Sequence, residues 1–372
     1  MYRSNNIQNR RICLKELVRV NTNILEKQYL QEGDLLICAR NGSRNLVGKC
    51  ALIDNLNEPT SFGAFMAVCR SALNPWIFQI LNSEYFNTYL DDSNSTAINQ
   101  VTQKMLLAFQ LPIPPAAEQE RIISKLKQWY EYIDEIEDRK IELESYIKQT
   151  KSKILDLAIS GKLVPQDPND EPAIELLKRI NPAFKPCDNS HYGNLPFEVP
   201  DGWCWATLGS IGKWQSGATP SRMRKDYYGG DIPWLKTGDL NDWYITDIPE
   251  YITQQALNET SVKLNPAGSI LIAMYGATIG KIGILTMPAT TNQACCACIS
   301  HNGIEQMYLF YYLLSHKGEF VRQGGGGAQP NISKEKIVET LIPIPPLSEQ
   351  LRIIKAIEAI FNQIDNITAE LS

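Results

Sequence analysis

The stretch Leu111–Asp134, LPIPPAAEQERIISKLKQWYEYID, reappears as Ile342–Asp365, IPIPPLSEQLRIIKAIEAIFNQID, in this chain of 372 residues. The repeat runs without a gap over 94–136 and 325–367. Each copy has a Pro-Ile-Pro-Pro segment, which prevents an earlier helix start, followed by Glu-Gln-x-Arg-Ile-Ile and apolar residues at helical spacing. The sequence therefore predicts two similar halves with a pseudo-twofold relation, each a globular segment followed by a long helix.

The helix of the first copy is predicted to form a coiled-coil seam. Over 116–159 apolar residues return every 3.5 residues, and Gly161 is expected to end the helix. At about 1.5 Å per residue this helix is about 66 Å long. An antiparallel second helix, stopping at Ser372, covers about half of it, so the rest is expected to be bare or covered by another chain. The interface is predicted to contain Leu126, Trp129, Ile133, Ile136, Leu143, Ile147, Ile154 and Leu157, with Ile357, Ile360, Ile364 and Ile367.

Composition indicates a globular protein of the cytoplasm. Hydrophobic residues make up 44% and charged residues 21%, while the amino terminus has no apolar signal core and no long apolar run follows. The nine cysteines are scattered, which favours reduced thiols. Cys295 and Cys298 have a metal-like spacing, but their apolar flanks predict a buried strand. The predicted division is 1–110 and 191–345 as globular domains, 111–190 as helix and Pro-rich connector, with a short helix at 173–180, and 346–372 as the distal helix.

The charge is unevenly distributed along the chain. The formal net charge is −5, yet residues 1–49 carry nine Lys and Arg against four Asp and Glu, whereas 111–200 carry twelve against sixteen. A phosphate responds to the local patch within a Debye length, so the acidic total does not exclude nucleic acid as a partner.

Catalytic motifs are absent from the sequence, but polar clusters are not. It has neither phosphate-binding nor dinucleotide-binding glycine loops, nor a nucleophile elbow or a zinc-protease motif, so no catalytic or metal residue is predicted. Short turn-rich segments instead hold Asn, Gln, Arg, Lys and glycine, which suit base edges and phosphates as well as turns. The candidate DNA-binding residues are Arg3, Asn5, Asn6, Arg40, Arg44, Lys49, Gln215, Ser216, Thr219, Ser221, Lys236, Thr237, Tyr275, Thr278, Lys281, Asn292, Gln293, Gln329 and Asn331.

The chain resembles the specificity subunits of type I restriction-modification systems over its whole length. The resemblance rests on GDIPWLKTGDL (230–240), YGATIGKIGIL (275–285), TNQA (291–294), IPIPPLSEQ (342–350) and ILDLAISGKLVPQDPNDEPA (154–173). It implies an α+β fold with two α/β target-recognition domains, each reading half of a bipartite DNA target, separated by a long antiparallel two-helix coiled coil. It also implies a non-catalytic chain that binds two modification subunits, which use S-adenosylmethionine, and restriction subunits, which use ATP and Mg, in host defence.

One departure from that family pattern concerns the first domain. Met1–Ile7 aligns with Trp234–Leu240, so the counterpart of the opening segment of the second domain, including Gln215–Ser221, is missing. Three hypotheses stay open: a DNA-reading subunit, a truncated or silent cassette of the same family, and a coiled-coil scaffold whose domains bind other proteins.

Overall fold

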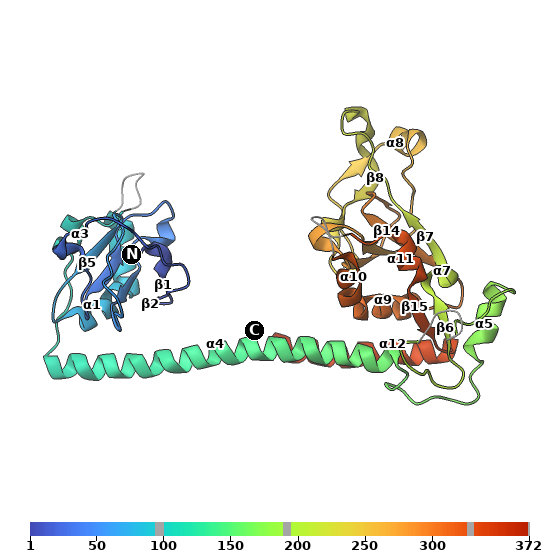
Figure 1. Ribbon diagram of the computed structural model, residues 1–372, viewed down its shortest axis with the longest axis horizontal. Coiled ribbons are helices and arrows are strands. Elements are labelled where there is room, and N and C mark those ends of the chain that lie inside the picture. Colours follow the sequence, from blue (N-terminus) through green and yellow to red (C-terminus); the bar gives the residue numbers. More distant parts are fainter. Residues whose placement is uncertain (94–99, 189–194, 326–330, 371–372) are drawn as a thin grey trace. The chain divides into compact units, whose positions relative to one another are not determined.

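The computed structural model describes all residues except 94–99, 189–194, 326–330 and 371–372. The chain divides into two compact units, Met1–Lys140 (unit 1) and Ile141–Ser372 (unit 2) (Figure 1). Helix α4 (Ala116–Ile159) contributes residues to both. It begins and ends where the sequence predicts, and Gly161 ends it with a φ of +70° while the Lys162 N–H donates to the Leu157 carbonyl at 2.8 Å.

Unit 1 is a small α/β domain. Its central sheet has the order β4-β3-β5, with both pairings antiparallel, and a separate hairpin joins β1 to β2. Four residues of the hairpin and helix meet: Arg11 forms a 2.6 Å ion pair with Asp134, and Arg10 lies 3.5 Å over the Tyr130 ring. The elements before α4 are β1 (Ile7–Gln8), β2 (Arg11–Ile12), β3 (Leu35–Cys38), β4 (Cys50–Leu52), β5 (Met66–Cys69), α1 (Asn74–Leu81), α2 (Glu84–Ser93) and α3 (Gln103–Ala108).

Unit 2 is a larger α/β domain, whose described residues form three sheets. Their orders are β7-β14-β11-β12-β9, β10-β8-β13 and β15-β6. Its helices are the end of α4, α5 (Ala173–Ile180), α7 (Leu208–Ile211), α8 (Gln254–Glu259), α9 (Gln306–Ser315), α10 (Lys317–Gly324), α11 (Lys334–Glu339) and α12 (Leu347–Glu370). Its strands are β6 (Cys204–Thr207), β7 (Gly212–Ser216), β8 (Tyr228–Leu235), β9 (Tyr244–Ile245), β10 (Tyr251–Ile252), β11 (Ile270–Ala273), β12 (Ile282–Leu285), β13 (Thr290–Thr291), β14 (Cys295–Ser300) and β15 (Leu341–Ile344).

The strand register confirms the predicted repeat. In unit 1 Leu35 pairs with Cys69 across β3 and β5, and in unit 2 Ile270 pairs with Cys298 across β11 and β14; both pairings continue antiparallel in the same register. Helix α3 likewise corresponds to α11, and Gln110–Ile113 to β15. The first four residues of β14 are buried, Cys296 and Cys298 in one hydrophobic cluster and Cys295 and Ala297 in another, as predicted for the Cys295 and Cys298 segment. Cys295, Cys296 and Cys298 of this strand are free thiols.

Helix α12 packs antiparallel against the last part of α4, inside unit 2. Lys151 forms an ion pair with Asp365 and lies 5.1 Å over the Phe361 ring, whereas Gln166, beyond the end of α4, bonds Glu349 at the start of α12. Ile353 and Ile357 are fully buried and share a core with Ile154, Leu155, Ala158 and Ile159. The predicted antiparallel helix pair is therefore confirmed along this part of α4.

The seam of α4 is covered only in part. Of its predicted residues, Ile154 is buried, and Leu126, Leu143, Ile147 and Leu157 are half-buried. Trp129, Ile133 and Ile136 are 55%, 44% and 66% exposed. On α12, Ile357 is buried, Ile360 and Ile364 are half-buried, and Ile367 is exposed. Within the described residues, then, the seam is bare at Trp129, Ile133 and Ile136, as predicted for part of its length.

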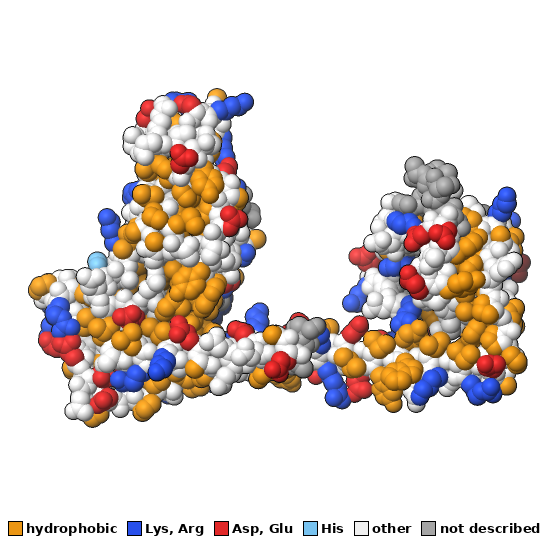
Figure 2. All heavy atoms as spheres, turned by 180° about the vertical axis from the view of Figure 1, so that it is seen from behind, with side chains coloured by type: hydrophobic (Ala, Val, Ile, Leu, Met, Phe, Trp, Pro, Cys, Tyr) orange, Lys and Arg blue, Asp and Glu red, His pale blue; other side chains and the backbone are white. Residues whose placement is uncertain are grey.

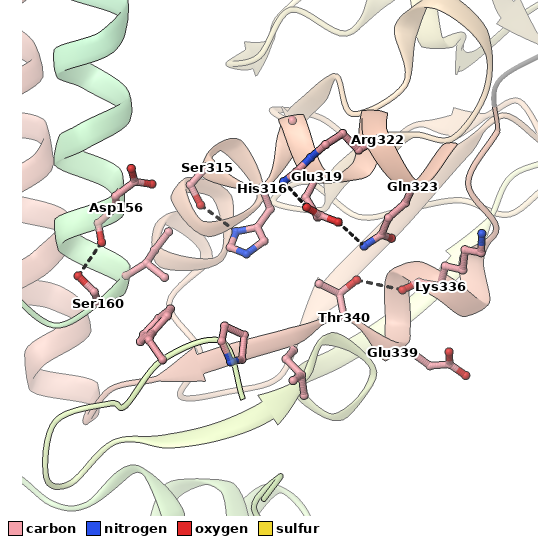
Figure 3. A pocket seen from close by; sticks show the side chains of 15 residues that line it. Asp156, Ser160, Ser315, His316, Glu319, Arg322, Gln323, Lys336, Glu339 and Thr340 are labelled. Atoms are coloured by element: carbon pink, nitrogen blue, oxygen red, sulfur yellow. Dashed lines mark hydrogen bonds and ion pairs between the residues drawn. The ribbon is translucent and has the colours of Figure 1, made fainter. Parts of the chain in front are cut away.

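A cavity of about 1030 Å³ opens in unit 2 between the end of α4, α10 and α11. His316 points into it beside Ser315, Glu319 and Arg322 (Figure 3). Its ring stacks on Tyr312 at 4.1 Å between centroids, and its Nδ1 lies 2.9 Å from the Ser315 hydroxyl. Burial lowers the pKa of His316 below its usual 6.5, although the Tyr312 carbonyl, Glu319 and Asp156 oppose this shift.

We expect unit 2 to lose stability as the pH falls below about 6.5. The unfolded chain takes up a proton at His316 in that range, whereas the folded chain resists it until its lowered pKa is reached, so the stability difference appears above 6.5 and is lost below. Urea denaturation between pH 7.5 and 5.5 measures the slope. His316→Gln is expected to flatten it, and His301→Gln, at an exposed position, serves as control. Equal slopes in all three proteins would contradict this role of His316.

Candidate nucleic-acid interface

Two of the predicted polar loops of unit 2 lie against each other. The loop that follows β7 is held by Gly217 N–H, which donates to the Cys295 carbonyl at 3.1 Å, and by Ala218 N–H, which donates to the Thr291 carbonyl at 2.9 Å. The Thr219 hydroxyl donates to the Gln293 side-chain carbonyl. Residues 74 positions apart in the sequence therefore meet at one surface.

Gly217 makes this close approach possible. A Cβ atom at this position would lie 2.2 Å from the Thr291 carbonyl oxygen and 2.4 Å from the Asn292 carbonyl oxygen. No side chain fits there, so the glycine is required by packing of one loop on the other rather than by a positive φ angle.

An arginine stacked on aromatic rings borders the same loops. The Arg222 guanidinium lies 4.9 Å from the Trp234 ring and 4.5 Å from the Tyr228 ring, and the Trp234 indole N–H donates to the Ala218 carbonyl at 3.0 Å. Arg222 was not predicted from the sequence, because the two aromatic rings beside it, Tyr228 and Trp234, are brought there by the folding of β8. The available signal was its place directly after Thr219-Pro220-Ser221.

Glu250 balances two cations of this surface. Arg222 lies 2.5 Å and Lys236 2.9 Å from its carboxylate. The Arg222 hydrogen bond first, and the Lys236 bond second, lower the Glu250 pKa to about 2. Both cations are partly exposed, so either side chain can turn toward a phosphate. The cation that turns breaks its ion pair with the ionised Glu250 carboxylate.

A third predicted loop meets the segment after α10. Tyr275 forms an isolated antiparallel bridge with Asn331, and both side chains are exposed. Thr278 donates to the Tyr275 carbonyl at 3.0 Å, and the Lys281 N–H donates to the Thr278 carbonyl at 2.9 Å. The backbone of the half-buried Lys281 is therefore held at the end of this turn. Gln329 lies outside the described residues.

The remaining candidate residues of unit 2 differ in the exposure of their side chains. Gln215 is half-buried and donates to Asn265 at 2.7 Å, whereas Ser221 is exposed. Thr237 is half-buried in a short 3-10 turn, and Ser216 and Asn292 are half-buried as well. Of the predicted set in unit 2, Thr219, Ser221, Tyr275, Gln293 and Asn331 are the exposed side chains.

In unit 1 the predicted residues also fall in adjoining loops. Asn41 donates to the Ser4 hydroxyl at 3.0 Å, which joins the loop of Arg3 to the loop of Arg40. Asn5 donates to Glu16 at 3.0 Å, and Arg44 forms an ion pair with Asp91. Arg3, Arg40 and Lys49 are exposed.

Asn6 is a structural residue. It is 1% exposed; its amide donates to the Cys13 carbonyl at 3.0 Å and the Glu16 carbonyl at 3.2 Å, while its oxygen accepts the Arg3 N–H at 2.9 Å. Its counterpart Asp239 accepts the Lys236 N–H at 2.8 Å in the same way. The expectation that Asn6 reads a base does not fit this burial, because reading would break all three bonds.

No cluster of His, Cys, Asp and Glu that could hold a metal occurs among the residues that the structure describes. In the same part of the chain no helix combines the length and apolarity needed to cross a bilayer.

Comparison with known proteins places the chain in a family. Residues 1–145 and 200–372 match the family model "Type I restriction modification DNA specificity domain". The EcoR124I/EcoR124II specificity subunit of Escherichia coli is 32% identical over 173 residues, 45% of this chain and 43% of that protein. The MjaIX specificity subunit of Methanocaldococcus jannaschii is 34% identical over 175 residues, 45% of this chain and 40% of that protein. The matched segments thus span less than half of either relative.

The fold is shared with solved structures. The HsdS subunit from Thermoanaerobacter tengcongensis aligns with a TM-score of 0.56 at 20% identity, over 99% of this chain and 83% of that one. A chain from a structural study of complex assembly and conformational transition of the type I R-M system aligns with a TM-score of 0.66 at 20% identity, over 92% and 77%. With the family model matched on both sides of the connector, this chain belongs to the type I restriction-modification DNA specificity family.

Proposed function

We propose that the chain is a DNA sequence-specificity subunit, and that the joined loops of unit 2 read one half of its target. The observation that carries this is the contact between the loop after β7 and the Thr291–Gln293 loop, which gathers exposed polar side chains beside the stacked Arg222. Amide side chains can read adenine edges, and arginine or lysine can bind phosphate or guanine. The family match supports this assignment.

The chemistry is proposed to lie on other chains. Two modification subunits would supply S-adenosylmethionine and methyl transfer to adenine, and restriction subunits would supply ATP-driven translocation and cleavage with Mg. The chain itself would be non-catalytic. This proposal is supported by the names of its relatives, which are specificity subunits of type I restriction enzymes.

Unit 1 is proposed to read the second half of a bipartite target, because its adjoining loops correspond to those of unit 2. Helix α4 would then set the number of unread base pairs between the halves. A 44-residue helix is about 66 Å long.

Two substitutions test the reading surface of unit 2. Gln293→Ala is expected to relax discrimination at one base position by about 1–3 kcal/mol, because an exposed amide can form a bidentate contact. Lys281→Ala is expected to weaken binding to all sequences and to lower the salt slope by about one phosphate contact. Binding of the assembled complex to a randomised target library, at several salt concentrations, measures both effects.

Gln254→Ala provides the matched control, because Gln254 is exposed on α8 and its amide donates to Asn258 of the same helix. It should change neither preference nor salt slope. If Gln293→Ala behaves like this control at every position, the loop does not read bases.

A protein-binding scaffold is the second candidate. It is favoured by the exposed Trp129, Ile133 and Ile136 on α4. Such a scaffold would keep its partners bound when the loops of unit 2 are altered, and it would show no sequence preference among DNA targets.

A further inference from the structure

In unit 2 one continuous segment, β6–α7–β7, covers three neighbouring surfaces. Strand β6 pairs antiparallel with β15, from Leu341 opposite Thr207 to Ile344 opposite Cys204. Strand β7 pairs antiparallel with β14. Between them α7 lies on α11, so closely that a Cβ on Gly209 would be 3.2 Å from the Val338 Cβ. The domain is thus closed by a segment of fewer than twenty residues.

The corresponding surfaces of unit 1 are uncovered. Strand β5, the counterpart of β14, is the edge of its sheet, with β3 as its one strand partner among the described residues. Leu107 on α3, the counterpart of Val338, is 80% exposed. Ile113, the counterpart of the fully buried Ile344, is 62% exposed. Figure 2 shows hydrophobic side chains gathered on unit 1 beside the start of α4.

The first turn of α4 also has an exposed residue, Glu118, whose counterpart in unit 2 is buried. Glu349, 1% exposed in unit 2, accepts the Trp203 indole N–H at 2.9 Å just before β6. Its counterpart Glu118 is exposed. The difference is not a local distortion, because the next residue keeps its bond in both units: Gln350 donates to the Pro345 carbonyl at 3.1 Å and Gln119 to the Pro114 carbonyl at 2.8 Å.

We propose that unit 1 binds a strand–turn–strand segment with the chemistry of residues 203–216 of unit 2: a tryptophan that donates to Glu118, one strand on Leu111–Ile113 and a second strand on the edge of β5. An open strand edge beside apolar side chains is completed by an added strand, which a helix or DNA does not supply. A second copy of this chain has no such segment to spare, because β6 and β7 are already paired in unit 2.

The donated segment also has a consequence for the loops. In unit 2 the loop that contacts Gln293 follows β7 directly. A donor segment would therefore bring an equivalent loop to unit 1. This last step rests on the proposed DNA-reading role, whereas binding of the segment does not.

The test uses the full chain and a synthetic peptide of residues 200–221 from unit 2, which carries Trp203, β6, α7 and β7. Hydrogen exchange is expected to slow at least tenfold in the presence of peptide at Val68 on the open edge of β5 and at Leu111 and Ile113, whereas the Met66 N–H already donates to the Gly63 carbonyl. Exchange in β14 and β15 should not change, because both are already paired. A Trp203→Ala peptide should bind at least tenfold more weakly, since it lacks the indole for Glu118.

Two variants of the chain form a matched pair. Ile113→Asp puts a charge on the acceptor surface and should abolish protection by the peptide. Ile136→Asp changes the same residue type at similar exposure, 66% against 62%, further along α4, and should leave protection intact. The proposal is overturned if saturating peptide protects none of these amides, or if both variants lose protection equally. DNA is absent throughout, so the result is independent of the reading role.

Discussion

Replacing Trp203 by alanine is expected to lower the free energy of unfolding of unit 2 by about 3–5 kcal/mol. The side chain is 7% exposed, belongs to the main core of unit 2, and lies next to Gly161 at the end of α4. Its loss leaves a cavity and removes one of two donors to the buried Glu349, the other being Gln166 at 3.1 Å. Urea denaturation, with hydrogen exchange in β14 to assign the transition to unit 2, measures the change.

Trp243→Ala is the control for this effect. Trp243 is 46% exposed and contacts Phe310 and Tyr244 by ring edges, at 5.7 and 5.3 Å between centroids. Its removal is expected to cost at most about 1.5 kcal/mol. Similar losses for the two variants would show that Trp203 does not close the core of unit 2.

Deleting Ile136–Glu142 from α4 is expected to shorten the unread spacer of the DNA target by about three base pairs. One heptad removes about 10 Å of helix and rotates the remainder by only about 20°, and DNA rises about 3.4 Å per base pair. The deleted residues precede the contacts of Lys151 with Phe361 and Asp365, and they follow those of Tyr130 and Asp134 with unit 1. The packing of both units is therefore retained.

The readout is the map of methylated adenines in cells that contain the modification subunits. The two half-sites should keep their sequences while the gap between them shortens. Duplicating the same heptad is the reciprocal control and should lengthen the gap by about three base pairs. Full methylation with an unchanged gap in both variants would show that α4 does not set the distance.

Features that depend on the spacing of apolar residues or on the internal repeat could be predicted from the sequence. The bounds of α4 and α5, the pairing of α12 with α4, and the buried strand around Cys295 were all predicted correctly. Each rests on a pattern that is local or that appears twice in the chain.

Contacts between distant short segments could not be predicted. Strand β6 pairs with β15 across more than 130 positions, and four-residue strands carry no signal of their partner. The site has the same difficulty: turn residues such as Asn6 look like base readers until their burial is known, while Arg222 gains its role only from the rings that β8 places beneath it. The assignment of the other candidate residues to DNA contacts stays a prediction.

The most direct test of the specificity role is methylation of a DNA substrate by defined components. The purified chain with S-adenosylmethionine should transfer no methyl group. The modification subunits with the chain should methylate adenine at one bipartite sequence, and the modification subunits without it should show no sequence preference. Methyl transfer by the chain alone, or the same methylation pattern with and without it, would contradict the account.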